Sequence, residues 1–438
     1  MSAPCSGSGK TLFTLGLLRV LAQKNIHVLP AKAGPDYIDP MFHTVACGIP
    51  SVNLDSWAMS QELIGQVASR RLSLSHTKKE TILVIEGAMG VLDGAGEEGR
   101  GSVADLAEAL DLPIVMIINA SQQSQSILLP PLGLSQARPQ IRLAGVILNK
   151  IASNKHLLGA TYQLNKHNIK LLGWLPKAQS FAIPERHLGL VTPSENLDIE
   201  KLVCGIANQM TESIDVDQIL KLADAPKLVK SITNNTSLIP LGQNIAVAND
   251  QAFCFMYTHQ LDAWHSAGAR VSFFSPLKDE GPEEDADAVF LPGGYPELYP
   301  DLLANNTNYK NKMRLAQSRG ALIYGECGGF MVLGNILEDK EGHQHPMLGL
   351  LPHTTSMKSP KLHLGYRLLQ GLKDTPFAGY SFSGHEFHYS QQIKINSEFK
   401  RLFGVIDSFG NQLPDTGLAA DNVCGSYSHI ICQRNENE

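Results

Sequence analysis

The stretch Ser6-Gly7-Ser8-Gly9-Lys10-Thr11 precedes the first helical pattern and decides the fold of the first half of the chain. Glycines let a loop turn its backbone amides toward a phosphate, and the following helix N-terminus adds partial positive charge. In such a loop Gly7 and Gly9 shape the backbone, Lys10 reaches the outer phosphates of a nucleotide, and the Thr11 hydroxyl contacts Mg²⁺. Helical spacing follows at once, in Leu12, Leu15, Leu18 and Leu21. The stretch predicts a phosphate loop that holds a nucleotide rather than a flexible Gly/Ser terminus.

The loop departs from the usual pattern in two ways. Pro4 stands where a glycine is expected, and few residues precede the loop although a strand should lead into it. Either the sheet lacks that strand, or a segment upstream of Met1 supplies it.

Short apolar runs rich in β-branched residues recur between the helical patterns of the first half. They are Ile82–Ile85, Ile114–Ile118 and Val146–Leu148. Runs of this length and composition are typical of buried parallel strands. The alternation predicts an open parallel sheet covered by helices, with ligands at the carboxyl ends of its strands.

Acidic side chains follow two of the runs that we expect to form strands near the phosphate loop. Asp36 and Asp39 lie in Gly34–Pro40, expected to be a rigid loop, while Glu86 ends a strand and Asp93 follows it. Acidic side chains at strand ends beside a phosphate loop are suitable Mg²⁺ ligands. Each alone could equally be a turn or cap residue.

The periodicity is lost after residue 224 and returns near residue 244, so we expect two domains. Residues 1–225 form the phosphate-loop domain, 226–243 a linker rich in proline and polar residues, and 244–438 a second α/β domain. Its predicted strands are Ile245–Ala248, Val271–Phe274, Val289–Leu291 and Leu322–Tyr324.

Cys327 lies in Gly325-Glu326-Cys327-Gly328-Gly329, after a strand and before a helical pattern. A sharp glycine-flanked turn of this kind exposes a nucleophile above a sheet. A thiol acts only as the thiolate and needs a base nearby. Three histidines are candidates on pattern alone: His385, His388 and His429. The amides of Gly293 and Gly294, which follow another strand, could form an oxyanion hole.

Composition restricts the class of protein. The chain has 438 residues, with 36 basic and 42 acidic side chains and a net charge of −6, which argues against nucleic acid as a partner. It has no apolar stretch long enough for a membrane span and no signal-peptide pattern. Its seven cysteines show no metal or disulfide spacing. We expect a cytoplasmic protein without membrane association.

Several blocks together resemble the cobyrinic/hydrogenobyrinic acid a,c-diamide synthases, in order along essentially the whole chain. The blocks are Ser6–Thr11, Lys32–Pro40 with Phe42-His43, Asn53–Asp55, Pro184–Leu190, the Cys327 turn, Leu364–Arg367, His385–Tyr389 and Gly425–His429. The block Gly34–Pro40 is the most specific. Leu364–Arg367 is closer to the hydrogenobyrinate branch of the family.

The resemblance implies an N-terminal domain similar to dethiobiotin synthetase, and a C-terminal class I-type glutamine amidotransferase domain. It implies an ATP- and Mg²⁺-dependent carbon–nitrogen ligase of cobalamin biosynthesis, which converts the a- and c-acetate groups of a corrinoid to amides through acyl phosphates. Cys327 would be the nucleophile and His429 its base, with L-glutamine as the nitrogen donor. No acid that would complete a triad is apparent.

The remaining roles are assigned within that chemistry. Thr11, Asp39 and Glu86 are expected to hold the metal, while Asp36, Tyr37, Asp39 and Asp93 position and activate the corrinoid diacid. Ammonia should travel by a sheltered route, because it must stay unprotonated. Whether the corrin carries cobalt is open, and a homodimer is compatible with the sequence.

Two other interpretations remain. A phosphate-loop ATPase of the partitioning or regulatory kind would explain the first half but not the thiol turn. Cobyric acid synthase joins similar domains but should lack the Gly34–Pro40 block in this form.

Overall fold

The computed structural model describes residues 1–73, 81–177, 185–186, 189–195, 198–227, 238–395 and 399–434. The chain forms two compact units, Met1–Thr233 and Asn234–Glu438. Residues 228–237, within the predicted linker, lie outside the described residues, as do Pro184, His187 and Leu188 of one family block.

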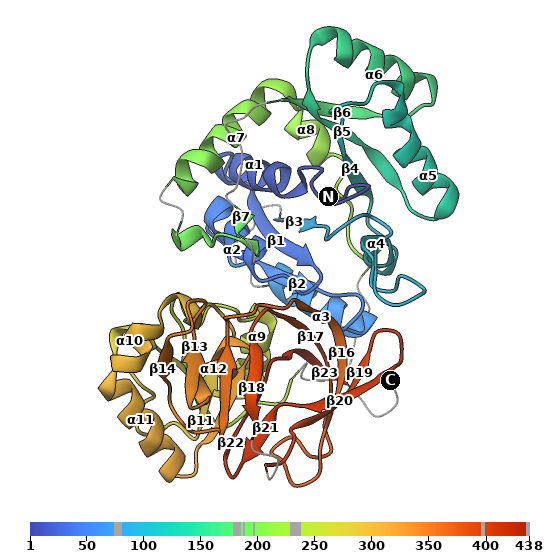
Figure 1. Ribbon diagram of the computed structural model, residues 1–438. Coiled ribbons are helices and arrows are strands. Elements are labelled where there is room, and N and C mark those ends of the chain that lie inside the picture. The colour runs from blue at the N-terminus through green and yellow to red at the C-terminus, as the bar shows by residue number, and fades with distance from the viewer. Residues whose placement is uncertain are drawn as a thin grey trace. The chain divides into compact units, whose positions relative to one another are not determined.

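The N-terminal unit alternates strands and helices, as predicted (Figure 1). Its elements are α1 (Lys10–Gln23), β1 (His27–Ala33), α2 (Ile38–Cys47), β2 (Val52–Leu54), α3 (Gln61–Ser73), β3 (Thr81–Glu86), α4 (Val103–Leu110), β4 (Ile114–Asn119), η1 (Gln125–Leu128), α5 (Leu129–Ala137), β5 (Leu143–Ile151), α6 (Asn154–Lys166), β6 (Leu171–Pro176), β7 (Glu185–Arg186), β8 (Gly189–Leu190), η2 (Pro193–Glu195), α7 (Ile199–Ser213) and α8 (Val216–Leu220).

Two parallel three-stranded sheets, β2-β1-β3 and β4-β5-β6, are joined through the residues before the phosphate loop. The Ser2 amide donates to the carbonyl of Val115 in β4 (2.9 Å), and the Met1 amino group donates to the carbonyl of Ile85 in β3 (2.7 Å). Figure 1 shows the N-terminus between β3 and β4. The first three residues therefore occupy the position where a leading strand was expected.

Helix α1 begins directly at Lys10 and buries its leucine-rich face. Gly16 on this helix lets α7 approach closely, since a Cβ there would lie 2.7 Å from Ile206 and 2.8 Å from Met210. A second core packs between β4, β5 and their helices, around Met116, Ile118 and Leu148. These cores fix the strand ends that carry the polar residues.

The C-terminal unit contains a larger number of strands. Its elements are β9 (Asn244–Ala248), α9 (Thr258–Ser266), β10 (Arg270–Phe274), η3 (Pro276–Lys278), β11 (Ala288–Leu291), η4 (Pro296–Leu298), α10 (Pro300–Asn305), α11 (Thr307–Ser318), β12 (Leu322–Glu326), α12 (Gly328–Leu333), β13 (Ile336–Glu338), β14 (Gln344–Pro346), β15 (His353–Ser356), β16 (His363–Gly371), β17 (Ser381–His388), β18 (Gln391–Ile395), β19 (Phe403–Asp407), β20 (Gln412–Thr416), β21 (Leu418–Ala420), β22 (Val423–Ser426) and β23 (His429–Arg434).

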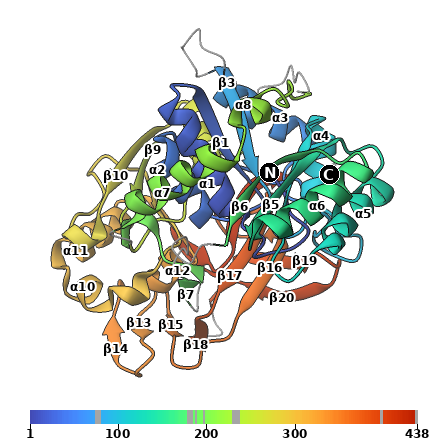
Figure 2. The ribbon, with the colours of Figure 1, turned by 90° about the horizontal axis from the view of Figure 1, so that it is seen from above.

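The main sheet of this unit has the order β10-β9-β11-β12-β22-β21 and is parallel except for β21. All four strands predicted from apolar runs belong to it. A second, antiparallel sheet, β20-β19-β16-β17-β23, was not predicted. Figure 2 labels its strands β20, β19, β16 and β17, and Figure 1 also labels β23. Its long strand β16 is largely half-buried and carries polar residues, so it lacks the continuous apolar run that identified the parallel strands.

Within the described residues, no helix is both long enough and apolar enough to cross a membrane.

Candidate active sites

The phosphate loop in the N-terminal unit has the backbone that its glycines allow. Gly7 and Gly9 have φ values of 74° and 97°, in the region that side chains disfavour. A Cβ on Gly9 would lie 2.1 Å from the Asn149 side-chain nitrogen, which donates to the Ser8 carbonyl at 2.9 Å. Asn149, near the end of β5, thus holds the phosphate loop by a hydrogen bond to its backbone. Sequence reasoning missed this residue, because an asparagine after an apolar strand resembles an ordinary turn.

The Lys10 side chain is buried and directed back over the loop. Its ammonium donates to the carbonyl of Met89 at 2.5 Å and to that of Cys5 at 3.5 Å. Burial and the nearby Lys32 ammonium lower the pKa of Lys10. A polyphosphate would supply the negative charge that this cation lacks, so the loop is electrostatically suited to one.

Glu86 lies at the centre of a buried polar cluster at the end of β3. Thr11 Oγ1 donates to Glu86 Oε1 at 2.6 Å, Lys32 Nζ donates to the same oxygen at 3.0 Å, and His43 Nε2 is 2.7 Å from Glu86 Oε2. Burial alone would raise the pKa of Glu86, but Lys32 and the His43 and Thr11 hydrogen bonds outweigh it and hold the pKa below its usual range. Glu86 is therefore ionised at neutral pH beside the phosphate loop.

Lys32 connects Glu86 to the predicted metal ligand Asp39. The Lys32 ammonium binds both carboxylates, and all three side chains are buried. Burial opposes its charge, yet Glu86 and Asp39 raise the pKa of Lys32. Sequence reasoning gave Lys32 no role, although a lysine near the end of a buried strand indicates a paired charge.

Asp36, Tyr37 and Asp93, which were predicted to position the substrate, lie at turns or at a helix end. Asp36 Oδ1 accepts the Ile38 amide at 2.7 Å, and Tyr37 precedes α2 as its N-cap. Asp93 is exposed and accepts the Gly90 amide at 2.7 Å, which closes a turn. Asp39 lies within the first turn of α2, so the predicted rigid loop ends at Tyr37. The structure brings Thr11, Asp39 and Glu86 together, and places Asp36 and Asp93 in separate turns.

The oxygen donors of this cluster are suited to Mg²⁺. Among the described residues, no group of three His, Cys, Asp or Glu side chains is placed to hold a metal ion unaided. Mg²⁺ usually keeps several waters and takes one or two carboxylates together with substrate phosphates. Thr11 and Glu86, with oxygens 2.6 Å apart at the phosphate loop, fit this mode of binding.

Cys327 in the C-terminal unit lies at a strained turn between β12 and α12. Its φ is 47° and its ψ is −106°, an unfavourable combination for a residue with a side chain. The Cys327 amide donates to the Ser426 carbonyl at 2.8 Å, which ties the turn to β22. Cβ atoms on Gly328 and Gly329 would lie 3.1 Å from Gly294 N and 1.9 Å from Leu291 O, so the turn needs both glycines.

Gly293 lies beside both Cys327 and His429. A Cβ placed on it would lie 2.4 Å from His429 Cε1 and 3.4 Å from Cys327 Cβ. The Gly293 carbonyl accepts the Phe255 amide at 3.0 Å, which fixes this loop. Gly294, the other predicted oxyanion residue, approaches the turn at Gly328. The structure thus brings Cys327, His429, Gly293 and Gly294 together.

The three candidate histidines occupy different surroundings. His429 pairs across the antiparallel sheet with His385, at a ring distance of 4.9 Å. His385 Nε2 lies 3.1 Å from the Tyr257 hydroxyl, and His388 stacks on Tyr427 at 3.9 Å. Of the three, His429 is the histidine that adjoins Gly293 among the described contacts of that glycine.

Both members of the thiol–imidazole pair are uncharged at neutral pH. Burial, with the charge of Glu297, raises the pKa of the Cys327 thiol. Burial, with His385 and His388, lowers the pKa of His429 well below its usual range. A neutral imidazole can accept a proton, so His429 is in the form that a general base requires.

Glu326, the residue before Cys327, was not predicted to belong to this site. Its carboxylate Oε2 lies 3.7 Å from His429 Nδ1, and both side chains are buried. The sequence did contain a signal, because a carboxylate ends an otherwise apolar strand next to the nucleophile.

Two family patterns match the chain, one for each unit. The AAA domain matches residues 2–184, and the CobB/CobQ-like glutamine amidotransferase domain matches residues 244–437. These matches, with the parallel sheets described above, confirm the predicted fold of a phosphate-loop domain followed by an α/β glutamine amidotransferase domain.

Similar proteins extend over both units. A hydrogenobyrinate a,c-diamide synthase from Brucella anthropi is 45% identical over 431 residues, covering 98% of this chain and 97% of that protein. A protein of the same name from Rhizobium meliloti is 42% identical, covering 98% of each. The solved structure of PurLQS from Thermotoga maritima covers 42% of this chain and 86% of its own at 19% identity, with a TM-score of 0.31.

Proposed function

The chain belongs to the hydrogenobyrinate a,c-diamide synthase family, and from this we propose that it converts the a- and c-acetate carboxylates of hydrogenobyrinic acid to amides. ATP activates each carboxylate as an acyl phosphate, and glutamine supplies the nitrogen. The protein is therefore a carbon–nitrogen ligase of cobalamin biosynthesis. The partitioning or regulatory ATPase alternative explains only the first unit, whereas the relatives extend over both.

The phosphate loop and the Glu86 cluster carry out the activation half of this reaction. The backbone around Gly7 and Gly9 receives the phosphates, and the Lys10 ammonium neutralises charge on the phosphoryl group during transfer. Thr11 and Glu86, with Asp39, would hold Mg²⁺, and the bound ion would offset further phosphate charge. Lys32 keeps the two carboxylates in place. Asp36, Tyr37 and Asp93 contribute to positioning of the corrinoid.

Cys327 and His429 carry out the ammonia-producing half. His429 accepts the thiol proton as the sulfur attacks the glutamine side-chain carbonyl. The C–N bond breaks, and ammonia leaves with the proton returned by His429. The amides near Gly293 and Gly294 stabilise the oxyanion that forms on the way. Water then hydrolyses the thioester to glutamate.

The observation that carries this proposal is the combination of sites in one chain. One unit has a phosphate loop with a desolvated lysine, and the other has a cysteine and a histidine that both adjoin Gly293. The named relatives match both units along nearly their full length. Ammonia production by one unit and carboxylate activation by the other account for both.

Separation of the two half-reactions tests the proposal. Cys327→Ala should abolish glutamine-dependent amidation of hydrogenobyrinic acid and leave ammonium-dependent amidation intact. Lys10→Ala should abolish amidation with either nitrogen source while glutamine hydrolysis persists. Loss of ammonium-dependent amidation in Cys327→Ala, despite an unchanged unfolding midpoint, would contradict the division of labour.

A further inference from the structure

A Cys–His pair usually needs a third group that orients the imidazole and stabilises its protonated form. The sequence offers no acid in a familiar position for this role. In the structure, the Glu326 carboxylate lies 3.7 Å from His429 Nδ1, an ion-pair rather than a hydrogen-bond distance. Such contacts are often long before substrate binds and tighten in the reacting complex.

Two hydrogen bonds hold Glu326 toward His429. Its Oε1 accepts the amide of Ile430, the residue after His429, at 3.1 Å, and the hydroxyl of Tyr324 at 3.1 Å. The acid is therefore adjacent in sequence to the nucleophile and bonded to the backbone beside the base. This arrangement fixes all three groups with respect to one another, because β12 and β23 belong to the two sheets that frame the site.

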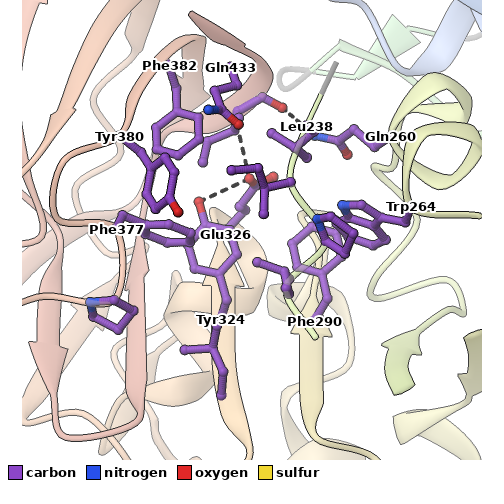
Figure 3. A pocket seen from close by; sticks show the side chains of 16 residues that line it. Leu238, Gln260, Trp264, Phe290, Tyr324, Glu326, Phe377, Tyr380, Phe382 and Gln433 are labelled. Atoms are coloured by element: carbon purple, nitrogen blue, oxygen red, sulfur yellow. Dashed lines mark hydrogen bonds between the residues drawn. The ribbon is translucent and has the colours of Figure 1, made fainter. Parts of the chain in front are cut away.

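An apolar cavity of about 180 Å³ adjoins the Glu326 carboxylate (Figure 3). Trp264, Phe290 and Phe377 contribute aromatic walls, and Glu326 contributes its carboxyl group. Figure 3 shows Tyr324 and Glu326 rising together from one strand into this cavity. Low-polarity surroundings strengthen any interaction between Glu326 and a protonated His429.

Other titratable groups also face this site. They are Cys327, Tyr324, His385, His388, Glu386, Glu297 and Cys424. Glu386 forms an ion pair with Arg367, in which the Arg367 guanidinium lies 2.9 Å from Glu386 Oε2. Burial makes His385 and His388 neutral by lowering the pKa of each to about 3. Glu326 is the carboxylate that contacts the His429 ring among the ion pairs of the described residues.

We propose that Glu326 is the positioning carboxylate of the glutaminase centre, forming a Cys327–His429–Glu326 relay in which the acid immediately precedes the nucleophile. This inference rests on the proposed function, because it assigns a role within glutamine hydrolysis.

The proton balance of this relay is simple. With Nδ1 of His429 directed to Glu326, Nε2 is the nitrogen that takes the Cys327 proton as the S–C bond forms. The imidazolium then lies beside an ionised Glu326, and it returns the proton to the leaving nitrogen as the C–N bond breaks. Glu326 does not itself transfer a proton in this step; it stabilises the cation and keeps the ring oriented.

The relay predicts a particular pH dependence. Burial raises the pKa of Glu326 to about 8, although the Ile430 and Tyr324 hydrogen bonds act in the opposite direction. A carboxyl with this pKa is mostly neutral below about pH 8 and ionised above it. Because the ionised form stabilises the imidazolium, kcat/KM for glutamine hydrolysis, which reports the free enzyme, should rise as the pH increases through about 8.

The decisive variant is Glu326→Gln, which keeps the shape and an oxygen acceptor but cannot ionise. We expect kcat for glutamine hydrolysis to fall roughly 100-fold with little change in KM, and the rise with pH to disappear. Glu386→Gln, the matched control, removes a neighbouring carboxylate that faces Arg367 and should lower kcat less than about 10-fold with the rise retained. A Glu326→Gln profile that keeps both rate and rise would overturn the proposal.

A second measurement decides the matter if Glu326→Gln does not fold. The rate of iodoacetamide alkylation of Cys327, followed on its peptide by mass spectrometry, reports thiolate formation without substrate turnover. In the unaltered protein it should increase through about pH 8, and in Tyr324→Phe the midpoint should move upward. An unmoved midpoint contradicts the relay.

Failure of this inference and failure of the proposed function give different results. If the function is wrong, the unaltered protein will not hydrolyse glutamine at any pH. If only the relay is wrong, the unaltered protein will hydrolyse glutamine, and Glu326→Gln will do so with the same pH profile.

Discussion

Glu86 and Glu326 occupy similar positions in the two units but have opposite electrostatic surroundings. Each is a buried carboxylate at the carboxyl end of a parallel strand, β3 in one unit and β12 in the other. Glu86 contacts the Lys32 ammonium, whereas Glu326 accepts hydrogen bonds from the neutral Ile430 amide and Tyr324 hydroxyl. Burial by itself therefore does not determine whether a carboxylate at a strand end is charged.

The difference corresponds to two kinds of chemistry. Glu86 has its pKa held below the usual range and remains an anion, as the role we propose for it beside Mg²⁺ and phosphates requires. Glu326 has its pKa raised to about 8, so it ionises near that pH, which suits the role we propose for it as partner of a histidine that gains and loses a proton. The two carboxylates should therefore respond differently to the same substitution.

The largest effect is expected on removing the cation that distinguishes the two sites. Lys32→Met leaves Glu86 and Asp39 buried without their shared partner, so the free energy of unfolding should fall by about 4 kcal/mol. Denaturant unfolding of the whole chain measures this. Lys24→Met, which removes an exposed ion pair with Asp217, is the control and should leave the midpoint unchanged. Equal effects of the two variants would show that the buried pairing is unimportant.

Replacing each glutamate by glutamine gives the next comparison. Glu86→Gln weakens the attraction that holds Lys32 and should destabilise the protein by about 2 kcal/mol. It should also abolish ammonium-dependent amidation. Glu326→Gln should preserve ammonium-dependent amidation, since we assign Glu326 to the other half-reaction. Analysis of the amide products formed with ammonium as the nitrogen source distinguishes the two variants. Equal loss of amidation in both would contradict the assignment of Glu86 and Glu326 to different half-reactions.

The pH dependence of the free energy of unfolding tests whether Glu326, unlike Glu86, is neutral in the folded protein. The folded-state pKa of Glu326 lies above its unfolded value, so its contribution is fully present below about pH 4.5 and is lost as pH rises through about 8. Between these values the unaltered protein should lose up to about 1.4 kcal/mol per pH unit relative to Glu326→Gln. Unfolding midpoints of both proteins across this pH range check the expectation. A constant difference between them would mean that Glu326 is ionised throughout.

The smallest effect is expected from the Tyr324 hydroxyl. Tyr324→Phe removes one hydrogen bond to Glu326 and should cost about 1 kcal/mol of stability. The same bond favours the ionised carboxylate, so the midpoint of the glutamine-hydrolysis pH profile should rise by up to about one unit. A downward shift would show that the hydroxyl instead favours the neutral acid.

The sequence predicted those features that depend on local pattern. The glycines and leucines around Lys10 predicted the loop and α1, and the apolar runs predicted the parallel strands of both units. The turn at Cys327 was also evident, because only glycines allow the close approaches to Leu291 and Gly294. Each of these follows from spacing within one short segment.

The missed features depend on contacts between distant segments. Residues 1–3 show too little pattern to predict a strand, yet they bond to both β3 and β4. Asn149 supports Ser8 from 141 residues away, and Glu326 meets the Ile430 amide from 104 residues away. The periodicity of a short segment cannot predict hydrogen bonds between residues so far apart in the sequence. The strands of the antiparallel sheet were missed because their half-buried residues lack a continuous apolar run.

The fate of the glutamine amide nitrogen tests the coupling of the two half-reactions most directly. The purified chain is incubated with hydrogenobyrinic acid, ATP, Mg²⁺ and glutamine labelled with heavy nitrogen in its amide, with unlabelled ammonium in the buffer. We predict a diamide that carries the label at both the a and c positions, formed only when ATP is present. The Cys327→Ala variant should form the same diamide without the label. A complete absence of ATP-dependent amide formation, on this acid and on its cobalt-containing counterpart, would contradict the proposed reaction.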